Sequence, residues 1–320
     1  MNDRTACGLR RIRPVGRGSR VRLLAPSSGG FSSEEVAAGV AELERLGFEP
    51  LVDTRVFDTQ GYVAGSPSSR AQQLKDAWRE PALDMVMAIR GGYGSVQLLP
   101  LLTPEDVGRG APAAFVGYSD TTSLHIWLNC HVGVTSVHGP MIERRVAAGA
   151  GAYDAASLLG ALSVQPIGPV ESDTMEALKL GDATGPLFGG TISQILGSLG
   201  TPWAFDPPQG HVLLLDEVGE RPYRLDRMIV QLIQSGLLAR AAGVVVGQLP
   251  RCDEADGRYT AQATVADALA AFPGPVVFGC PTGHTTTPLV TVPLGAQVRV
   301  SAQARPTVIV EESIVVGSDR

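Results

Sequence analysis

Ser119 is the residue whose type and setting first indicate chemistry. It lies in the stretch 115–121, FVGYSDT, where an apolar segment runs through Gly-x-Ser into a segment of helical character. Such a turn exposes the serine hydroxyl, and the helix N-terminus behind it stabilises negative charge. Thr121 replaces the last glycine of the G-x-S-x-G signature, so the α/β-hydrolase family is not indicated. The pattern predicts a nucleophile elbow, and a serine that only caps a helix is the alternative.

A glycine loop, RGGYG at 90–94, follows another apolar segment. Glycine lets backbone N–H groups approach a ligand closely, so this loop could supply an oxyanion-hole donor or cradle a phosphate. No Walker lysine accompanies the loop, which argues against phosphate binding. Arg90 could hold a carboxylate through two hydrogen bonds. An ordinary strand-to-helix turn would use the same residue types.

Two adjacent carboxylates and one histidine complete the set of candidate groups. Asp216 and Glu217 end the apolar run 213–215, and they could orient a histidine or lie solvated at the end of a strand. Among the five histidines, His284 lies in a loop of Gly, Thr and Pro without apolar periodicity, so it is the least suited to a core. The histidines follow no metal-ligand spacing. We therefore expect acid–base chemistry at His284, with no metal and no cofactor.

The elements that must position these residues alternate along the first half of the chain. Strands are expected at 21–25, 50–52, 84–89 and 113–117, with helices expected at 32–46, at 67–80, after the loop 90–94 and at 120–129. This rhythm favours a parallel sheet with helices on both faces. Beyond it, strands are expected at 212–215, 243–247 and 276–278, helices at 224–235 and 264–271, and short β-strands in the tail 297–316.

The predicted fold class is α/β. An N-terminal parallel-sheet α/β domain carries the nucleophile elbow, and a C-terminal α/β domain has a mixed sheet. The expected divisions are a basic flexible arm at 1–20, the nucleophile domain at 21–142, a linker or helical connection at 143–183, and the domain with the acid and the histidine at 184–320. Because the candidate groups fall in both domains, we expect the site in the crevice between them.

Charge and composition exclude several classes of partner. The chain of 320 residues has 26 Lys and Arg against 32 Asp and Glu, which gives a formal net charge of −6 and no electrostatic reason to expect nucleic acid. The arginines within 1–20 are expected to form a solvated arm. No apolar segment of a secretory signal follows them, and no run approaches the roughly 20 apolar residues that span a bilayer. The expectation is a cytoplasmic protein without a membrane partner.

Taken together, these stretches resemble the serine LD-carboxypeptidase family, also called muramoyl-tetrapeptide carboxypeptidases. Their order along the chain, rather than any one motif, makes the resemblance specific. The motifs that carry it are APSS at 25–28, RGGYG at 90–94, GYSDTT at 117–122, HGPM at 138–141, GGTIS at 189–193, GTPW at 200–203, GERPYR at 219–224 and GH at 283–284.

The resemblance implies a catalytic triad in the chain order serine, carboxylate, histidine. Ser119 matches the nucleophile of the family and His284 matches its general base. The acid of the family commonly stands in a Leu-Glu-Asp pattern, whereas this chain has Leu-Asp-Glu at 215–217. Asp216 holds the matching position and Glu217 follows it. Adjacent strand residues point to opposite faces, so only one of them should reach His284; the register of 213–215 and the family position favour Asp216, and Glu217 is the alternative.

The resemblance also implies an oxyanion hole, a substrate and an assembly. The backbone N–H groups of Gly92 and Asp120 would form the hole, and the protein would be a homodimer without a metal. The implied reaction hydrolyses an L,D peptide bond and releases a terminal D-amino acid, D-Ala, from a murein tetrapeptide in cell-wall recycling. An exopeptidase must recognise a free carboxylate, and Arg90 and Arg224 are the candidates for this contact.

Two other functions would use the same features. Microcin C self-immunity peptidases of the same family hydrolyse peptidyl- or aminoacyl-nucleotides, but they tend to lack the GERPYR motif and to carry a longer insertion before the second domain. A non-catalytic two-domain module would bind a nucleotide or an amino acid at the glycine loop without turnover. Loss of Ser119 would abolish activity in a peptidase and would not affect such a binding module.

Overall fold

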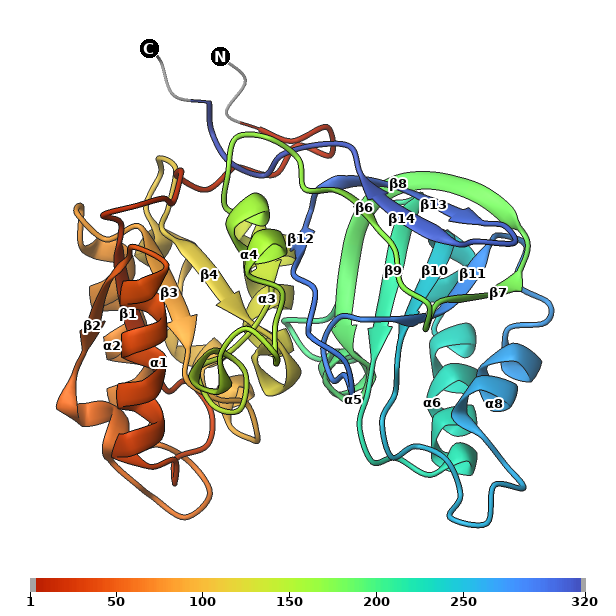
Figure 1. The fold of residues 1–320 in the computed structure, drawn as a ribbon, viewed down its shortest axis with the longest axis horizontal. Helices are drawn as coiled ribbons and strands as arrows, with labels where there is room; N and C mark the ends of the chain where they lie inside the picture. The colour runs from red at the N-terminus through yellow and green to blue at the C-terminus, as the bar shows by residue number, and fades with distance from the viewer. Residues whose placement is uncertain (1–3, 318–320) are drawn as a thin grey trace.

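The computed structural model describes residues 4–317 and contains two β-sheets that lie side by side, each with helices packed on it (Figure 1). The first sheet is built mainly from the first half of the chain and the second sheet from the second half. The predicted fold class is thereby confirmed, because the first sheet is largely parallel and the second is mixed. Residues 1–3 of the expected arm and 318–320 of the expected C-terminal domain lie outside the described residues.

The N-terminal sheet has six strands in the order β12-β5-β4-β3-β1-β2. Neighbouring strands are parallel, except that β12 from the second half of the chain pairs antiparallel with β5. The carboxyl ends of the parallel strands share one edge, so the loops at 25–28, 90–94 and 118–121 gather there. The strands are β1 Arg20–Leu24, β2 Glu49–Val52, β3 Met85–Ala88, β4 Ala114–Gly117, β5 Ser136–His138 and β12 Val292–Leu294.

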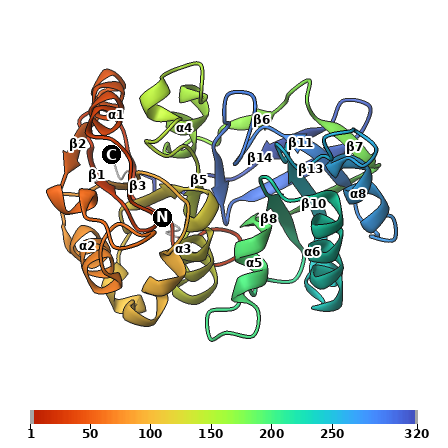
Figure 2. The same cartoon turned by 90° about the horizontal axis from the view of Figure 1, so that it is seen from below.

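Helices cover both faces of this sheet, with α1 and α4 on one face and α2 and α3 on the other (Figure 2). Trp78 of α2 packs on Phe115 of β4 and on Trp127, so aromatic rings cover the strand that leads to Ser119. The helices are α1 Ser33–Arg45, α2 Pro67–Arg79, α3 Thr122–Ile126 and α4 Ala155–Ala161; short 3-10 helices are η1 Thr54–Phe57, η2 Ser95–Leu101, η3 Pro104–Val107, η4 Ser119–Thr121 and η6 Val146–Ala148, and η5 Trp127–Val132 is a π-helix.

The C-terminal sheet has eight strands in the order β6-β14-β13-β8-β9-β10-β11-β7. Its central strands β8 to β11 run parallel, and the strands outside them pair antiparallel. The strands are β6 Gly168–Val170, β7 Glu176–Lys179, β8 Gly181–Thr191, β9 His211–Asp216, β10 Ala241–Gly247, β11 Val276–Cys280, β13 Gln297–Ala302 and β14 Thr307–Val310.

One face of this second sheet packs on helices. Leu225, Ile229 and Leu232 of α6 share a buried core with Leu213 and Leu215 of β9. The helices are α5 Ile192–Ser198, α6 Pro222–Gln234, α7 Leu237–Arg240 and α8 Ala261–Ala268. Among residues 4–317, no helix is both long enough and apolar enough to cross a bilayer.

The segment 143–183, expected from its composition to be a linker or helical connection, also contributes strands to the C-terminal sheet. It contains α4, but β6 pairs with β14 and β7 pairs with β11 at the two ends of that sheet. These strands have three and four residues and lie at sheet edges, so they carry too little alternation to be recognised in the sequence.

Residues 4–20 pack against the rest of the protein, which corrects the flexible arm expected from the sequence. Leu9, Ile12 and Val15 are buried at every third position. The arginines between them find acceptors on the protein, and Arg13 donates to three backbone carbonyl groups. Burial of the apolar side chains therefore anchors the segment, while the guanidinium groups exchange water for carbonyl oxygens.

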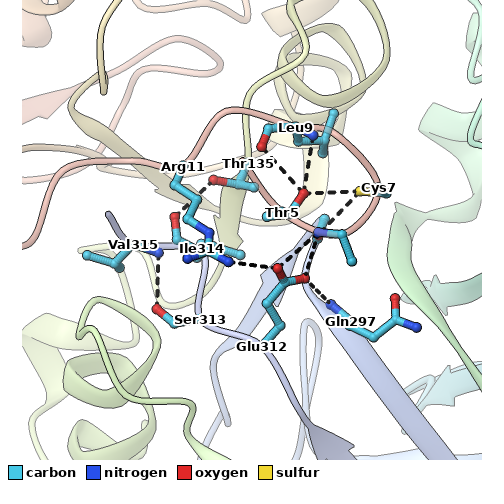
Figure 3. Close-up of polar contacts among 12 residues, drawn as sticks. Thr5, Cys7, Leu9, Arg11, Thr135, Gln297, Glu312, Ser313, Ile314 and Val315 are labelled. Atoms are coloured by element: carbon cyan, nitrogen blue, oxygen red, sulfur yellow. Dashed lines mark hydrogen bonds and ion pairs between the residues drawn. The ribbon is translucent and has the colours of Figure 1, made fainter. Parts of the chain in front are cut away.

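The N-terminal segment also meets the C-terminal segment, as Figure 3 shows. The Ile12 N–H donates to the Ile314 carbonyl at 2.9 Å, and the Val316 N–H donates to the Ile12 carbonyl at 2.9 Å. Arg11 pairs with Glu312 at 2.7 Å (Figure 3). The two ends of the described chain are therefore held together by backbone pairing and by an ion pair.

Candidate active site

Ser119 lies at the turn between β4 and η4, which leads into α3. Its backbone φ is 65°, in the left-handed region that a residue with a side chain rarely adopts. Strain of this kind at a strand-to-helix turn is typical of a nucleophile elbow, because it projects the hydroxyl away from the backbone. The strand, the turn and the helix follow one another as the stretch 115–121 predicts.

His284 and Asp216 continue a hydrogen-bonded chain that begins at Ser119. His284 Nε2 lies 3.1 Å from Ser119 Oγ, and His284 Nδ1 lies 2.7 Å from Asp216 Oδ2. The His284 backbone N–H also donates to Asp216 Oδ1, at 3.0 Å. Both oxygens of Asp216 are thereby engaged, which holds the imidazole with Nε2 toward the serine. The chain crosses the domain boundary, because Ser119 follows β4 whereas the other two residues follow β11 and end β9.

Strand alternation decides which of the two adjacent acids meets His284. Successive side chains of a strand point to opposite faces of the sheet, and in β9 Leu214 enters one hydrophobic core while Leu215 enters the other. Asp216 continues the side of Leu214, and Glu217 continues the side of Leu215. Only Asp216 therefore contacts His284.

Glu217 has a different set of partners. Its carboxylate accepts the backbone N–H groups of Ser193 and Val218, each at 3.0 Å. Burial raises the pKa of Glu217, and the hydrogen bonds from these N–H groups oppose that rise. Glu217 thus holds the start of α5 against the turn that follows β9.

The surroundings of His284 make its imidazole a stronger base. Burial alone lowers the pKa of His284, but the charge of Asp216 and its hydrogen bond together outweigh burial, so the net pKa lies above the usual 6.5. The ring of Tyr118 packs edge-on against the imidazole, with ring centroids 5.1 Å apart. Burial raises the pKa of the Tyr118 hydroxyl, so this wall of the site stays uncharged at neutral pH.

The glycine loop 90–94 meets the serine turn directly. A side chain on Gly91 would place its first carbon 3.0 Å from Ser119 Oγ and 3.4 Å from the Asp120 nitrogen. The backbone N–H groups of Gly92 and Asp120 have no hydrogen-bond acceptor among residues 4–317. Two segments with unpaired N–H groups therefore meet at the serine, an arrangement that suits an oxyanion hole.

Buried hydrogen bonds fix the glycine loop to the serine turn. Asp120 accepts the Ser95 N–H through Oδ2 at 2.8 Å, and it accepts the Ser95 hydroxyl through its backbone carbonyl at 2.6 Å. On the other side of the loop, Ser28 Oγ accepts the Tyr93 N–H at 3.0 Å. The Asp120 side chain and the APSS motif thus hold the two candidate oxyanion donors in one arrangement.

The two arginines expected to bind the substrate carboxylate have partners of their own. Arg90 pairs with Glu143 at 3.2 Å and donates to the Gly29 carbonyl at 3.0 Å. Arg224 lies on α6, where its side chain is 47% exposed and pairs with Glu220 at 3.3 Å. Neither arginine contacts the hydrogen-bonded chain described above.

Sequence reasoning missed three residues that shape the site. Tyr118 packs on His284, Arg145 contacts the Tyr118 hydroxyl, and the buried Arg70 donates to the Gly94 carbonyl beneath the glycine loop. The sequence gives no signal for these three roles. For the two arginines the reason is that an arginine in an amphipathic helix or a loop is usually solvated. Among residues 4–317, no three His, Cys, Asp or Glu side chains are grouped so that they could hold a metal ion.

A two-domain α/β protein in which a strained serine meets a histidine–carboxylate pair is by its fold and site a hydrolase of the serine type. The chain belongs to the LD-carboxypeptidase family: the N-terminal domain of that family matches residues 21–139, and its C-terminal domain matches residues 184–300. The resemblance drawn from the motifs is confirmed. Membership in a peptidase family also favours an enzyme over a non-catalytic binding module.

Relatives and solved structures agree with this assignment. A Streptomyces coelicolor protein that is named as a carboxypeptidase is 35% identical over 89% of this chain and 91% of its own length. The murein tetrapeptide carboxypeptidase of Pseudomonas aeruginosa is 28% identical over 83% of this chain and 88% of its own length. The structure of MccF in complex with glutamyl sulfamoyl guanosine has a TM-score of 0.86 at 19% identity, covering 96% of this chain and 99% of that chain, which shows a shared fold.

Proposed function

We propose that this protein is a serine LD-carboxypeptidase that hydrolyses an L,D peptide bond and releases terminal D-Ala from a murein tetrapeptide. The reaction would belong to cell-wall recycling in the cytoplasm. The observation that carries the proposal is the hydrogen-bonded chain from Ser119 through His284 to Asp216 at the domain boundary. In it Ser119 is the nucleophile, His284 the general base and Asp216 the acid.

The chemistry follows from the order of these three groups. A serine hydroxyl is a weak nucleophile, so His284 Nε2 takes its proton while Oγ attacks the carbonyl carbon of the scissile bond. The same proton then passes to the leaving amine, and the acyl-enzyme is hydrolysed by a water that His284 activates in turn. Asp216 accepts a hydrogen bond from the Nδ1–H group of His284, which fixes the tautomer and stabilises the imidazolium.

The oxyanion is stabilised by the N–H groups of Gly92 and Asp120. One such donor contributes about 3–4 kcal/mol to stabilisation of the transition state. Support for this role comes from the absence of other acceptors for both N–H groups among the described residues and from the close approach of Gly91 to Ser119.

Family membership and the GERPYR motif at 219–224 support a murein peptide as the substrate. A relative named for murein tetrapeptides aligns over most of both chains. These observations favour a peptide with a free C-terminal D-amino acid over a nucleotide conjugate.

The test is release of D-Ala from a murein tetrapeptide by the purified protein. Ser119→Ala and His284→Ala should each lower kcat by about 10⁴- to 10⁶-fold, and the double variant should be little worse, because triad members act in one step. Losses that multiply in the double variant would show that the two residues do not share a step.

Hydrolysis of an aminoacyl-nucleotide is the second candidate function. It is favoured by the fold shared with MccF, whose solved complex contains glutamyl sulfamoyl guanosine. A side-by-side assay of the tetrapeptide and an aminoacyl-nucleotide separates the two, and a higher kcat/KM for the nucleotide would replace the proposal made here.

We also propose that the protein forms a homodimer, as the family resemblance implies. Sedimentation velocity at several protein concentrations tests it, and a single species at the mass of one chain at every concentration would contradict it.

A further inference from the structure

A carboxypeptidase of this kind must bind the terminal carboxylate close to the general base. The leaving amine has to lie within hydrogen-bond reach of His284 Nε2, which protonates it. The carboxyl carbon of an amino acid is only two bonds from its nitrogen, about 2.5 Å on standard geometry. The cation that binds the carboxylate therefore has to stand on the His284 side of the site.

Arg145 is the arginine that stands there. Its Nη2 donates to the carbonyl of Thr285, the residue after His284, at 3.0 Å. Its Nε lies 3.5 Å from the hydroxyl of Tyr118, the residue before Ser119. Each of these contacts is thus one residue away from a member of the proposed triad. The positive charge of Arg145 also acts on His284, where it opposes part of the rise in pKa that Asp216 causes.

The guanidinium of Arg145 has no carboxylate partner among residues 4–317. Its third contact is the Ala152 carbonyl, to which Nη1 donates at 3.1 Å. A guanidinium has five N–H donors, so one N–H on each terminal nitrogen remains without an acceptor in the described part of the chain. Two N–H groups are what a carboxylate accepts in a bidentate pair.

The carboxylates near Arg145 already have other partners, so none of them neutralises its charge. The nearby carboxylates Asp216 and Glu217 are buried and already engaged, the first by His284 and the second by backbone N–H groups. Glu143, two residues before Arg145, pairs with Arg90 instead. An anion brought by the substrate would therefore be the first to pair with Arg145.

We propose that Arg145 binds the terminal carboxylate of the substrate, with Tyr118 and the Thr285 carbonyl holding its side chain in place. The inference rests on the proposed carboxypeptidase function and names the residue that makes the enzyme specific for a free C-terminus. It replaces Arg90 and Arg224 in that role, because both of these are occupied by glutamates.

The experiment compares kcat/KM for a murein tetrapeptide with kcat/KM for the same peptide carrying a C-terminal amide. The wild-type enzyme should prefer the free acid. Arg145→Gln should lower kcat/KM for the acid by about 10²-fold, since a charge-assisted bidentate contact is lost, and should change the amide by less than about threefold. Arg145→Lys keeps the charge without the fork and should recover part of the preference.

Arg144→Gln is the matched control. The Arg144 side chain is the neighbouring guanidinium, 78% exposed and 3.9 Å from Glu143, and its loss should leave the preference for the acid intact. Thermal unfolding of each variant identifies any that fails to fold, and Arg145→Lys then carries the test.

Three results would overturn the inference. Equal losses on the acid and the amide would mean that Arg145 only braces the loop of His284. Loss of the preference in Arg90→Gln or Arg224→Gln, but not in Arg145→Gln, would return the role to those residues. A wild-type enzyme that cleaves neither peptide would instead remove the proposed function, and this inference with it.

Discussion

At the residue scale, one peptide unit separates two carboxylates with different environments. Asp216 is fully buried and accepts hydrogen bonds from His284 through both oxygens, whereas Glu217 accepts the N–H of Ser193 at the start of α5 and the N–H of Val218 in the turn after β9. Their difference arises from the alternation of side chains along β9, which sends one toward the domain boundary and the other toward the helices. The charge of Asp216 therefore acts on the imidazole through a direct contact.

This contact sets the pH dependence of the enzyme. As the proposed base, His284 must be neutral to accept the Ser119 proton, so kcat/KM should fall as pH drops through the pKa of His284, with the midpoint above 6.5. Asp216→Asn removes the raising charge; it should move this acid limb to lower pH and lower kcat by about 10⁴-fold, by analogy with serine proteases.

Glu217→Gln is the matched change at the neighbouring position, and it should lower kcat by less than about tenfold because Glu217 does not touch the imidazole. The pH–rate profiles of both variants are the measurement. The opposite ranking of the two variants would move the acid's role to Glu217.

At the scale of elements, the site depends on how the loop 90–94 approaches the turn at Ser119. Gly91 has no side chain to fill the space beside Ser119, where the substrate carbonyl is proposed to bind, and Asp120 joins the loop to the turn through Ser95. Gly92 has a φ of +99°, which favours glycine, whereas Gly91 lies outside the left-handed region. A substitution at 91 therefore acts through the side chain's contact with the serine turn and not through the φ of residue 91 itself.

Gly91→Ala should lower kcat by about 10²-fold or more and should also lower the melting temperature, because the added methyl group would lie 2.9 Å from Ser119 Cβ and 3.0 Å from Ser119 Oγ, beside the proposed position of the oxyanion, so that the serine turn must shift. Steady-state kinetics and thermal unfolding measure the two effects separately. Gly110→Ala is the control, since a side chain there meets nothing within 4 Å. Full activity in Gly91→Ala would show that the oxyanion lies elsewhere.

At the scale of the whole molecule, the site exists only where the two domains meet, so their relative position has to be maintained. The strand β12 contributes to this by carrying the second half of the chain into the N-terminal sheet. The N-terminal segment contributes as well, because Ile12 is fully buried and forms backbone hydrogen bonds with the C-terminal segment.

Ile12→Ala should lower the free energy of unfolding by about 2–5 kcal/mol, through lost burial and the cavity left behind. Folded Ile12→Ala protein should keep the kcat of the wild type, because the N-terminal segment does not contact the candidate site. Urea denaturation gives the free energy, and Pro14→Ala, at an exposed position, is the control that should change it by no more than about 1 kcal/mol, the effect of losing a proline on the unfolded chain. An unchanged free energy in Ile12→Ala would mean that the segment contributes nothing to stability.

The sequence by itself determined many of the elements and the candidate groups of this protein, but not the edge strands β6 and β7. Local patterns suffice for this: Gly-x-Ser after an apolar strand predicts the elbow at Ser119, and a histidine in a Gly/Thr loop stands out from core histidines. The order of the motifs was enough to identify the family. These features depend on residues that are close in the chain, so they can be predicted without knowledge of the fold.

Only the tertiary structure decided which groups meet. The choice of Asp216 over Glu217 depends on which face of β9 looks toward the other domain, and the position of Arg145 beside Thr285 joins residues 140 apart in the sequence. The packing of the N-terminal segment likewise depends on carbonyl groups from distant loops. Such contacts are set by the docking of two sheets, and residue type and spacing along the chain carry no record of that geometry.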